Sequence, residues 1–246
     1  MFYSQFGEDK ILFEIFQRKT HGVCVEIGAN NGVDDSTTLF FEKIGWKCIL
    51  VEPNPFLCQE IRAVRNALVY EYAASSRSGV ATLHVVEGNE RSHGLSTISP
   101  TKEYLARVKN HNFFSHPVQV RTMTLDEILS NAQIVGGIDF ISIDVEGHEP
   151  EVLEGFSLEK WKPTVILLEN NSNVENNATS NYLNKFGYVR FFKTGVNDWY
   201  AHQTNKRLMS MRSNIRIGLT AFNEKIKRLK ILLILKIRNF FGPRTI

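Results

Sequence analysis

The stretch VCVEIGANNG, residues 23–32, decides the fold of this chain. Its first five residues form a β-branched, apolar run that predicts a short buried strand. The strand ends at Gly28, and a second glycine at Gly32 closes a loop of small and polar residues. Such a loop lets the backbone turn tightly under a ligand and expose its N–H groups, and a serine just beyond it can cap a helix. The residues that we expect at this ligand-binding corner are Gly28, Ala29, Asn30, Gly32 and Ser36.

The spacing of the corner indicates which ligand it binds. A dinucleotide-binding loop needs a second glycine two positions after the first, where this chain has Asn30. Glu26, inside the end of the strand, would repel a phosphate but could accept hydrogen bonds from an ammonium group. The pattern E-x-G-x-x-x-G therefore favours S-adenosylmethionine (SAM), whose amino-acid end is cationic, over NAD. A glycine-rich strand end can also be an ordinary turn.

Two further strand ends carry carboxylates. The apolar run 47–51 ends in Glu52-Pro53-Asn54, and an acidic residue about 20 positions beyond the glycines commonly holds the hydroxyls of a ribose. A solvated loop carboxylate is the alternative for Glu52. The run 138–143 leads into DVEGHE at 144–149, three carboxylates and a histidine that are costly to place together unless they bind something.

With these blocks, the chain resembles the FkbM-type methyltransferases, which are SAM-dependent O-methyltransferases. The matching blocks, in the order of the family, are SQFGED (4–9), VEIGANNG (25–32), VEPNP (51–55), GLST (94–97) and IDVEGHE (143–149). The resemblance implies that Ser4 and Gln5 lie near the methionine end of SAM. Many members have a lysine two positions before the aspartate of the last block, where this chain has Ser142. The acceptor or its orientation can therefore differ here.

The order of the predicted elements indicates a single α/β domain. The chain has 246 residues and is 43% hydrophobic, enough for one full core. Strands and helices alternate, which implies a doubly wound, mostly parallel sheet of the Rossmann-like class I methyltransferase type, with its ligand beyond the carboxyl ends of the strands. Ala73 and Ala74, after the third strand, would leave room for the adenine. We expect helices at 5–20, 35–44, 55–65, 125–131, 149–156 and 179–186, and strands at 23–27, 47–51, 68–72, 138–143, 164–169, 188–192 and 198–202.

Residues 79–121 interrupt this alternation, with strands expected at 80–86 and 118–122. A connection this long inside a compact domain is more often functional than idle. We interpret it as a cap that binds the acceptor, although a structural satellite core is an equal alternative.

Methyl transfer to a hydroxyl requires alignment of the acceptor and removal of its proton. The candidates for the base are Asp144, Glu146, His148 and His93, and the sequence leaves the choice among them open. Asp144 follows the strand beside the glycine corner, so we expect it to face SAM and to be a cofactor contact as well. His148 could instead be an ordinary helix-start residue. Carboxylates with a histidine could also hold a divalent cation, a hypothesis that the spacing leaves open and to which we assign no ligand.

The charge of the chain is divided unevenly. The net charge is +3, but residues 205–246 contain eleven basic residues and one acidic residue, so residues 1–204 carry about −7. Residues 226–241 interleave basic and apolar side chains, which is typical of a helix that lies in a membrane interface, or docks on the domain or on a partner. Nucleic acid is not favoured, because no RNA-binding module is recognised. We expect a methyltransferase domain at 1–204 and a basic amphipathic tail at 205–246.

The cysteines bear on the compartment. Cys24, Cys48 and Cys58 are an odd number without metal-type spacing, which predicts reduced core thiols. We see no signal peptide and no stretch long enough to span a membrane, so we expect a cytoplasmic protein, with the tail as its contact to a membrane surface or a partner.

The sequence therefore predicts a SAM-dependent O-methyltransferase. Its acceptor, a sugar hydroxyl in a glycan, a glycolipid or a glycosylated metabolite, is implied by the resemblance. The alternative is a catalytically silent SAM-fold module that its tail attaches to a membrane or a protein. The oligomeric state stays open.

Overall fold

The computed structural model describes residues 1–88, 92–170 and 178–211. The chain divides into two units, residues 1–204 and 205–246, and the fold below is that of the first. The predicted amphipathic helix at 226–241 lies outside the described residues. Within the described part of the chain, every helix is too short or too polar to cross a bilayer.

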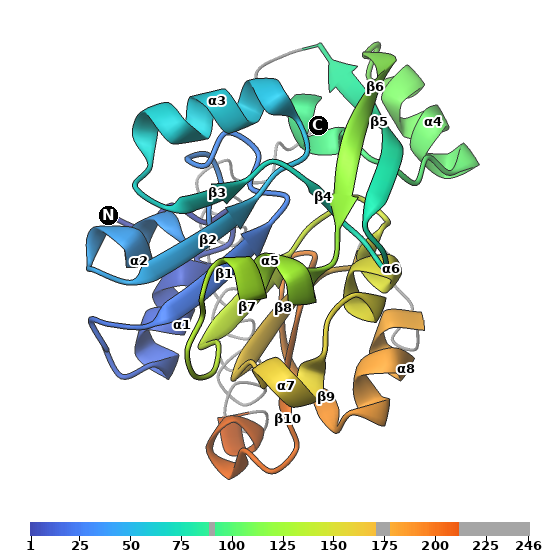
Figure 1. Cartoon of the computed structure of the whole chain (residues 1–246). Coiled ribbons are helices and arrows are strands. Elements are labelled where there is room, and N and C mark those ends of the chain that lie inside the picture. Colours follow the sequence, from blue (N-terminus) through green and yellow to red (C-terminus); the bar gives the residue numbers. More distant parts are fainter. Residues whose placement is uncertain (89–91, 171–177, 212–246) are drawn as a thin grey trace, which may run out of the picture. The chain divides into compact units, whose positions relative to one another are not determined.

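The core of the fold is a seven-stranded sheet with the order β3-β2-β1-β7-β8-β10-β9 (Figure 1). Only β10 runs against its neighbours, since it pairs antiparallel with β8 and with β9. This confirms the predicted fold class, a mostly parallel sheet of the class I methyltransferase type. The strands are β1 (Val23–Ile27), β2 (Lys47–Val51), β3 (Leu68–Tyr70), β7 (Phe140–Ile143), β8 (Val165–Glu169), β9 (Tyr188–Thr194) and β10 (Asn197–His202).

Helices cover both faces of this sheet. They are α1 (Glu8–Ile15), α2 (Leu39–Lys43), α3 (Pro55–Val64), α5 (Leu125–Asn131), α6 (Glu149–Glu154), α7 (Leu158–Trp161) and α8 (Ala178–Lys185). Local signals fix several starts. Asn54 caps α3 by accepting a hydrogen bond from Phe56 N, and Thr124 forms a capping box with Glu127 at the start of α5.

Two helices begin later than predicted. The helix expected at 5–20 begins at Glu8, because Gly7 has φ +79°, and its helical backbone ends before Gln17 and Arg18, which have φ of 53° and 60°. The helix expected from residue 35 begins only at Leu39. The residues before it are held in a loop that forms part of the site described below.

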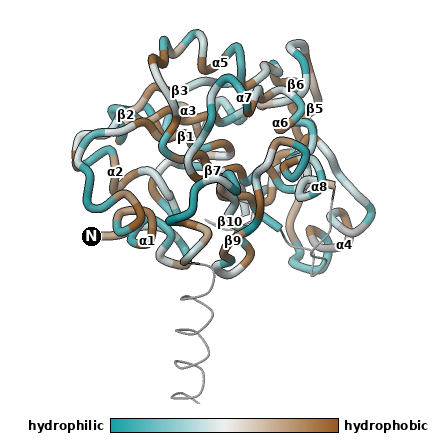
Figure 2. The backbone as a smooth tube through the Cα atoms, turned by 90° about the horizontal axis from the view of Figure 1, so that it is seen from below, coloured by the Kyte–Doolittle hydropathy of each residue, from teal (hydrophilic) through white to brown (hydrophobic). Residues whose placement is uncertain are grey.

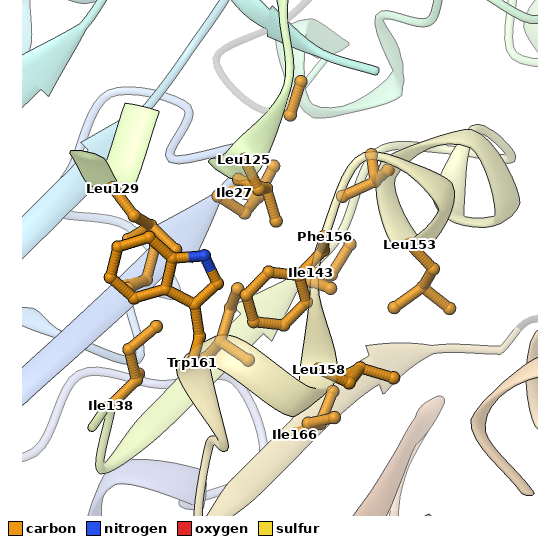
Figure 3. Close-up of a cluster of buried hydrophobic side chains, with 14 of the residues drawn as sticks. Ile27, Leu125, Leu129, Ile138, Ile143, Leu153, Phe156, Leu158, Trp161 and Ile166 are labelled. Carbon is orange, nitrogen blue, oxygen red and sulfur yellow. The ribbon is translucent and has the colours of Figure 1, made fainter. Parts of the chain in front are cut away.

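The main core lies on one face of the sheet. Alternate residues of β1, β7 and β8 point to this face and meet side chains of α5, α6 and α7 (Figure 3). The Trp161 indole packs among them and donates a hydrogen bond from Nε1 to Asp126 Oδ1 at 2.8 Å. Each large side chain buried in this way contributes about 1.5–3 kcal/mol relative to exposure.

The opposite face is packed with aromatic rings. The ring centroid of Phe41 lies 4.6 Å from that of Trp46 and 4.9 Å from that of Phe140. Hydrophobic residues recur along the strands and helices, whereas many connecting loops are hydrophilic (Figure 2). The sheet is therefore buried on both sides, as a parallel sheet requires.

The segment after β3 forms a second, three-stranded sheet with the order β4-β6-β5. Its long strands β5 and β6 pair antiparallel from Gly79↔Thr122 to Glu87↔Phe114, so both predicted strands are confirmed but are longer than expected. A helix that the sequence did not indicate, α4, packs there with a small core of Val86, Tyr104 and Val108. The elements are β4 (Ala73–Ala74), β5 (Gly79–Glu87), η1 (Ser92–Leu95), α4 (Lys102–Asn110) and β6 (Phe114–Met123), which stand together beside the main sheet in Figure 1.

Candidate functional site

A cavity of about 380 Å³ lies at the carboxyl ends of β1, β2, β7 and β8. Small-molecule sites typically have volumes of roughly 300–1,000 Å³. All three carboxylate-bearing strand ends reach this cavity. The predicted site residues that line it are Gln5, Glu26, Gly28, Ala29, Asn30, Glu52, Pro53, Ala73, Ala74, Asp144, Glu146 and His148.

Five predicted site residues are placed differently. Ser4, which the resemblance placed near the methionine end of SAM, is not among the lining residues, and its Oγ donates to Asp9 Oδ1 at 2.7 Å. Gly32, Ser36 and Asn54 are not among the lining residues and support the loops behind the wall. The side chain of His93 lies outside the described residues, although its backbone belongs to η1.

Gly28 joins the ends of three strands at the centre of the site. Its N–H donates to Val51 O of β2 at 2.9 Å, and Asp144 N, after β7, donates to Ile27 O at 3.0 Å. Gly28 has φ +79°, and a Cβ at this position would lie 1.8 Å from Asp144 O. No side chain fits there, so glycine is required for the backbone to pass this close to the neighbouring strand end.

Glu26 is bound to the loop that precedes α2. Its Oε1 accepts from Thr37 N at 2.7 Å and Thr37 Oγ1 at 3.0 Å, and its Oε2 accepts from Ser36 Oγ at 2.8 Å and Thr38 Oγ1 at 2.5 Å. These four donors fill the acceptor sites of one carboxylate. Glu26 thus borders the cavity but holds the loop, and its predicted contact with an ammonium group stays a prediction.

Arg65 supports the same loop from behind. Its side chain is buried and donates to Ser36 Oγ at 3.3 Å, to Thr38 Oγ1 at 3.1 Å and to Glu42 Oε2 at 2.9 Å. The two hydroxyls therefore accept from Arg65 and donate to Glu26. This network explains why the helix starts only at Leu39, and why Ser36 acts inside the loop.

Glu52 is almost fully buried at the end of β2, with 5% of its surface exposed. Its Oε2 accepts from Asn30 N at 3.0 Å and its Oε1 from Asn54 N at 2.9 Å. Burial raises the pKa of this carboxyl to about 7, against the opposing effect of the two N–H groups. Each oxygen has acceptor capacity left at the edge of the cavity, which suits a pair of neighbouring hydroxyls.

An acidic cluster, formed by Asp144, Glu146 and Glu169, lies on the other side of β1. One carboxylate oxygen from each lies within 4.8 Å of the other two. The register explains the meeting, because Ile143 of β7 pairs with Leu168 of β8, so the next residue of each strand lies at the same edge. Sequence analysis missed Glu169, although it closes the apolar run of its strand.

The acidic cluster shifts the pKa of Asp144, one of its members. The Asp144 carboxyl is open to the cavity, but the protein around the cavity desolvates it, and the charges of Glu169 and Glu146 add to this. Together they raise its pKa well above the ordinary value for aspartate. Glu146 has φ 50° and precedes Gly147 with φ 100°, a turn that Thr97 Oγ1 holds by donating to Glu146 O at 2.9 Å.

Three carboxylates at these distances are also suitable oxygen ligands for a hard divalent cation. His148, which the sequence grouped with them, is not a member of the cluster. The cation therefore stays a prediction.

His148 connects three segments. Its Nε2 lies 3.0 Å from Ser75 Oγ, after β4, and its Nδ1 lies 2.7 Å from Ser99 Oγ of the inserted segment. Burial lowers the pKa of the imidazole, and Glu151, 3.4 Å away, opposes this shift. With both ring nitrogens engaged, His148 is placed as a structural link at the start of α6, although it still touches the cavity.

The N-terminal segment forms a wall that the sequence indicated only in part. Gln5 lines the cavity together with Phe6 and Glu8, and its place near the methionine end of SAM stays a prediction. Glu8 Oε1 accepts from Thr194 Oγ1 at 2.8 Å and from Asn197 Nδ2 at 3.0 Å, which ties the segment to the turn between β9 and β10. From sequence alone, a glutamate that follows a glycine indicates only the first turn of a helix. The part that Glu8 takes in the wall was therefore not predicted.

A family model described as "Methyltransferase FkbM domain" matches residues 26–190. No curated protein gives a significant match.

Several solved structures are similar. A precorrin-6y C5,15-methyltransferase from Geobacter metallireducens is 12% identical, with a TM-score of 0.39, over 78% of this chain and 84% of that one. A TehB-like SAM-dependent methyltransferase from Corynebacterium glutamicum is 8% identical, with a TM-score of 0.41, over 81% and 89%. An O-methyltransferase from Bacillus cereus, solved in complex with SAH, is 15% identical, with a TM-score of 0.36, over 78% of both chains. With TM-scores this low, these matches add nothing to the assignment.

Proposed function

The chain belongs to the FkbM methyltransferase family and is a SAM-dependent methyltransferase, and from this premise we propose that it methylates a hydroxyl oxygen of a sugar, in a glycan, a glycolipid or a glycosylated metabolite. The observation that carries the proposal is the position of Asp144. Its carboxyl opens into the cavity and has a raised pKa, which suits a group that must take a proton from an alcohol.

The order of the residues that line the cavity supports SAM as the cofactor. Glu52 has acceptor capacity for the two ribose hydroxyls, and the buried Ala73 and Ala74 leave space beside it for a flat base. Gly28 allows a ligand to approach the backbone closely. Since β1 separates β2 from β7 in the sheet, a nucleoside held at Glu52 directs the other end of the molecule toward Asp144.

The chemistry asks the protein for alignment and for one proton acceptor. Bound SAM supplies an electrophilic methyl group on a sulfonium. As the new O–CH₃ bond forms and the S–CH₃ bond breaks, the hydroxyl proton passes to a base, and we assign that role to Asp144, with Glu146, His148 and His93 as the alternatives from sequence. General-base catalysis of this kind contributes about 10²–10⁴-fold.

The test separates binding from transfer. The wild-type chain should bind SAM by calorimetry and transfer labelled methyl groups to members of a panel of neutral glycosides. Asp144→Asn should keep SAM affinity within about threefold and lose about 10²-fold or more of kcat. Asp144→Asn with wild-type turnover would remove Asp144 from the mechanism, and SAM binding without any transfer would favour the silent-module alternative.

A further inference from the structure

The aromatic ring of Phe6 rests with one face on a glycine. A Cβ added at Gly195, in the turn between β9 and β10, would lie 2.4–2.5 Å from three consecutive atoms of the ring, Cδ2, Cε2 and Cζ. A point that is this close to three consecutive ring atoms, and almost equally far from each, lies over the face of the ring and not beside its edge. Gly195 therefore covers one face of Phe6, and its lack of a side chain allows the contact.

The remaining surface of this ring is open. Phe6 lines the cavity, and 42% of its surface is exposed. Because one face rests on Gly195, the exposed part is the other face and the edge. The backbone beside the ring is fixed as well, since Phe6 N donates to Glu8 Oε2 at 2.9 Å and Glu8 Oε1 accepts from Asn197 Nδ2 at 3.0 Å. The ring is therefore held in position without a ligand.

The order of the strands places this ring beyond the proposed base. At the carboxyl edge of the sheet, Asp144 follows β7, Glu169 ends β8, and Asn197 begins β10, in register with Glu169. Neighbouring strands lie about 4.8 Å apart, so the turn under the ring is about 10 Å from β7, on the side away from Glu52. One sugar ring can bridge such a distance between two side chains. Tyr72, the other phenyl-type ring among the described lining residues, follows β3 at the opposite end of the sheet.

The lining beside the ring combines an apolar and a polar group. Val196 and Asn197, from the turn that supports Phe6, also line the cavity. A pyranose has the matching surface, because the C–H groups on one side of the sugar ring form an apolar face and the hydroxyls point outward around it. An aromatic face packs against such C–H groups, and an amide can pair with a hydroxyl.

We propose that Phe6 is the platform for the acceptor, with the apolar face of a pyranose stacked on the open face of its ring and a hydroxyl of the sugar directed to the amide of Asn197. The inference rests on the proposed function, because it concerns the acceptor of that same site. Phe6 then determines specificity and takes no part in the chemical step. Since the stack is the same before and during transfer, its loss should raise KM and leave kcat unchanged.

Three variants of the full chain separate the ring from other effects. Phe6→Leu removes the ring and keeps an apolar side chain, whereas Phe6→Tyr keeps the ring. Phe2→Leu is the control, because Phe2 belongs to the same segment and is 41% exposed but is not among the lining residues. We expect the KM of pyranosides to rise about three- to tenfold in Phe6→Leu and to change less than about twofold in the other two. The Kd of S-adenosylhomocysteine (SAH) should change less than about twofold in all three, which also shows that they are folded.

Two measurements use one panel of probes. The panel consists of the methyl pyranosides of glucose, galactose, mannose and rhamnose, with glucitol as an acyclic polyol and phenol as a flat ring. Transfer of labelled methyl groups from SAM gives KM and kcat. Saturation-transfer NMR on the SAH-bound protein detects the ring C–H protons of a bound pyranoside without turnover. We expect these NMR signals for at least one pyranoside with the wild type, and weaker signals with Phe6→Leu.

The outcomes distinguish the inference from the proposed function. If the wild type and Phe6→Leu give the same KM and the same NMR signals for a pyranoside, the inference is overturned and the sugar methyltransferase stands. A preference for glucitol or phenol over every pyranoside also overturns it, because neither has the apolar face of a pyranose. If SAH binds but no pyranoside is bound or methylated, the inference and the sugar acceptor of the proposed function fail together.

Discussion

The two ends of the cavity use carboxylates in opposite ways. On the cofactor side, Glu26 and Glu52 are nearly buried, and neutral donors of neighbouring loops hold each of them in one orientation. On the other side, Asp144, Glu146 and Glu169 lie against one another around open space. The first arrangement fixes backbone and ligand geometry. The second raises the pKa of Asp144, which suits a reacting group.

The boundary between the two ends is Gly28, and its loss should have the largest effect. In Gly28→Ala the new Cβ meets Asp144 O, a backbone atom that cannot move without displacing β7. We expect unfolding to become easier by about 4 kcal/mol and SAM binding to be lost. Thermal melts and calorimetry measure both.

A second glycine separates the clash from the backbone strain. Gly136 also has a positive φ of 92°, but a Cβ there meets nothing within 4 Å. Gly136→Ala should therefore cost only about 1 kcal/mol. Equal losses in the two variants would show that conformation, and not the contact with the end of β7, makes Gly28 necessary.

Loss of the Glu26 carboxylate, which holds the loop before α2, should have the next largest effect on stability. In Glu26→Gln an amide nitrogen would face two of the four donors, and the hydroxyls of Ser36 and Thr38 cannot simply reverse, because Arg65 already donates to both. We expect a loss of about 2–3 kcal/mol in the free energy of unfolding by urea titration. Glu60→Gln, exposed on α3, should change it by less than about 0.5 kcal/mol. A stable Glu26→Gln that fails to bind SAM would instead restore the direct contact with the ammonium group.

Glu52 makes cofactor binding depend on pH. Its pKa of about 7 lies above the ordinary value of 4.5, so without ligand its contribution to stability falls as the pH rises between these values. Ribose hydroxyls need the ionised carboxylate. SAM binding should therefore become stronger as the pH rises, whereas stability without ligand falls. We expect the Kd of SAM to rise by up to about tenfold per pH unit below pH 7. Calorimetry from pH 8 to 5.5 tests this, and Glu52→Gln should bind weakly with a flat profile. If the Kd of SAM in Glu52→Gln depended on pH as it does in the wild type, a group other than Glu52 would be responsible for the titration.

The sequence indicated more of the cavity lining around Gly28 and Glu52 than around Glu169, for a physical reason. Gly28, Asn30 and Glu52 belong to local patterns in which a strand, a tight turn and a carboxylate follow one another at fixed spacing. Glu169 ends an apolar strand and acquires meaning only when the register sets it beside Asp144.

Local spacing was also insufficient in two other places. The partners of Glu26 are ten to twelve residues away in a loop whose Asp35 has φ 57°, and no periodicity indicates such a loop. The ring of His148 is turned to Ser75 and Ser99, which are 73 and 49 residues away in the chain. Strand patterns are local and so were predicted, whereas these contacts depend on tertiary structure.

A substitution in the N-terminal wall of the cavity, formed by Gln5, Phe6 and Glu8, should have the smallest effect on cofactor binding. Glu8 contacts the turn of Thr194 and Asn197 through neutral hydrogen bonds, so Glu8→Gln keeps its shape and one acceptor oxygen. If the segment holds Gln5 against the cofactor, the Kd of SAM should rise only about three- to tenfold, with kcat reduced less. Glu14→Gln, on the same helix and in an exposed ion pair with Arg18 just beyond the helix end, should leave the Kd unchanged. A larger loss than that in Glu52→Gln would mean that the N-terminal wall, and not the end of β2, is the principal anchor of the cofactor.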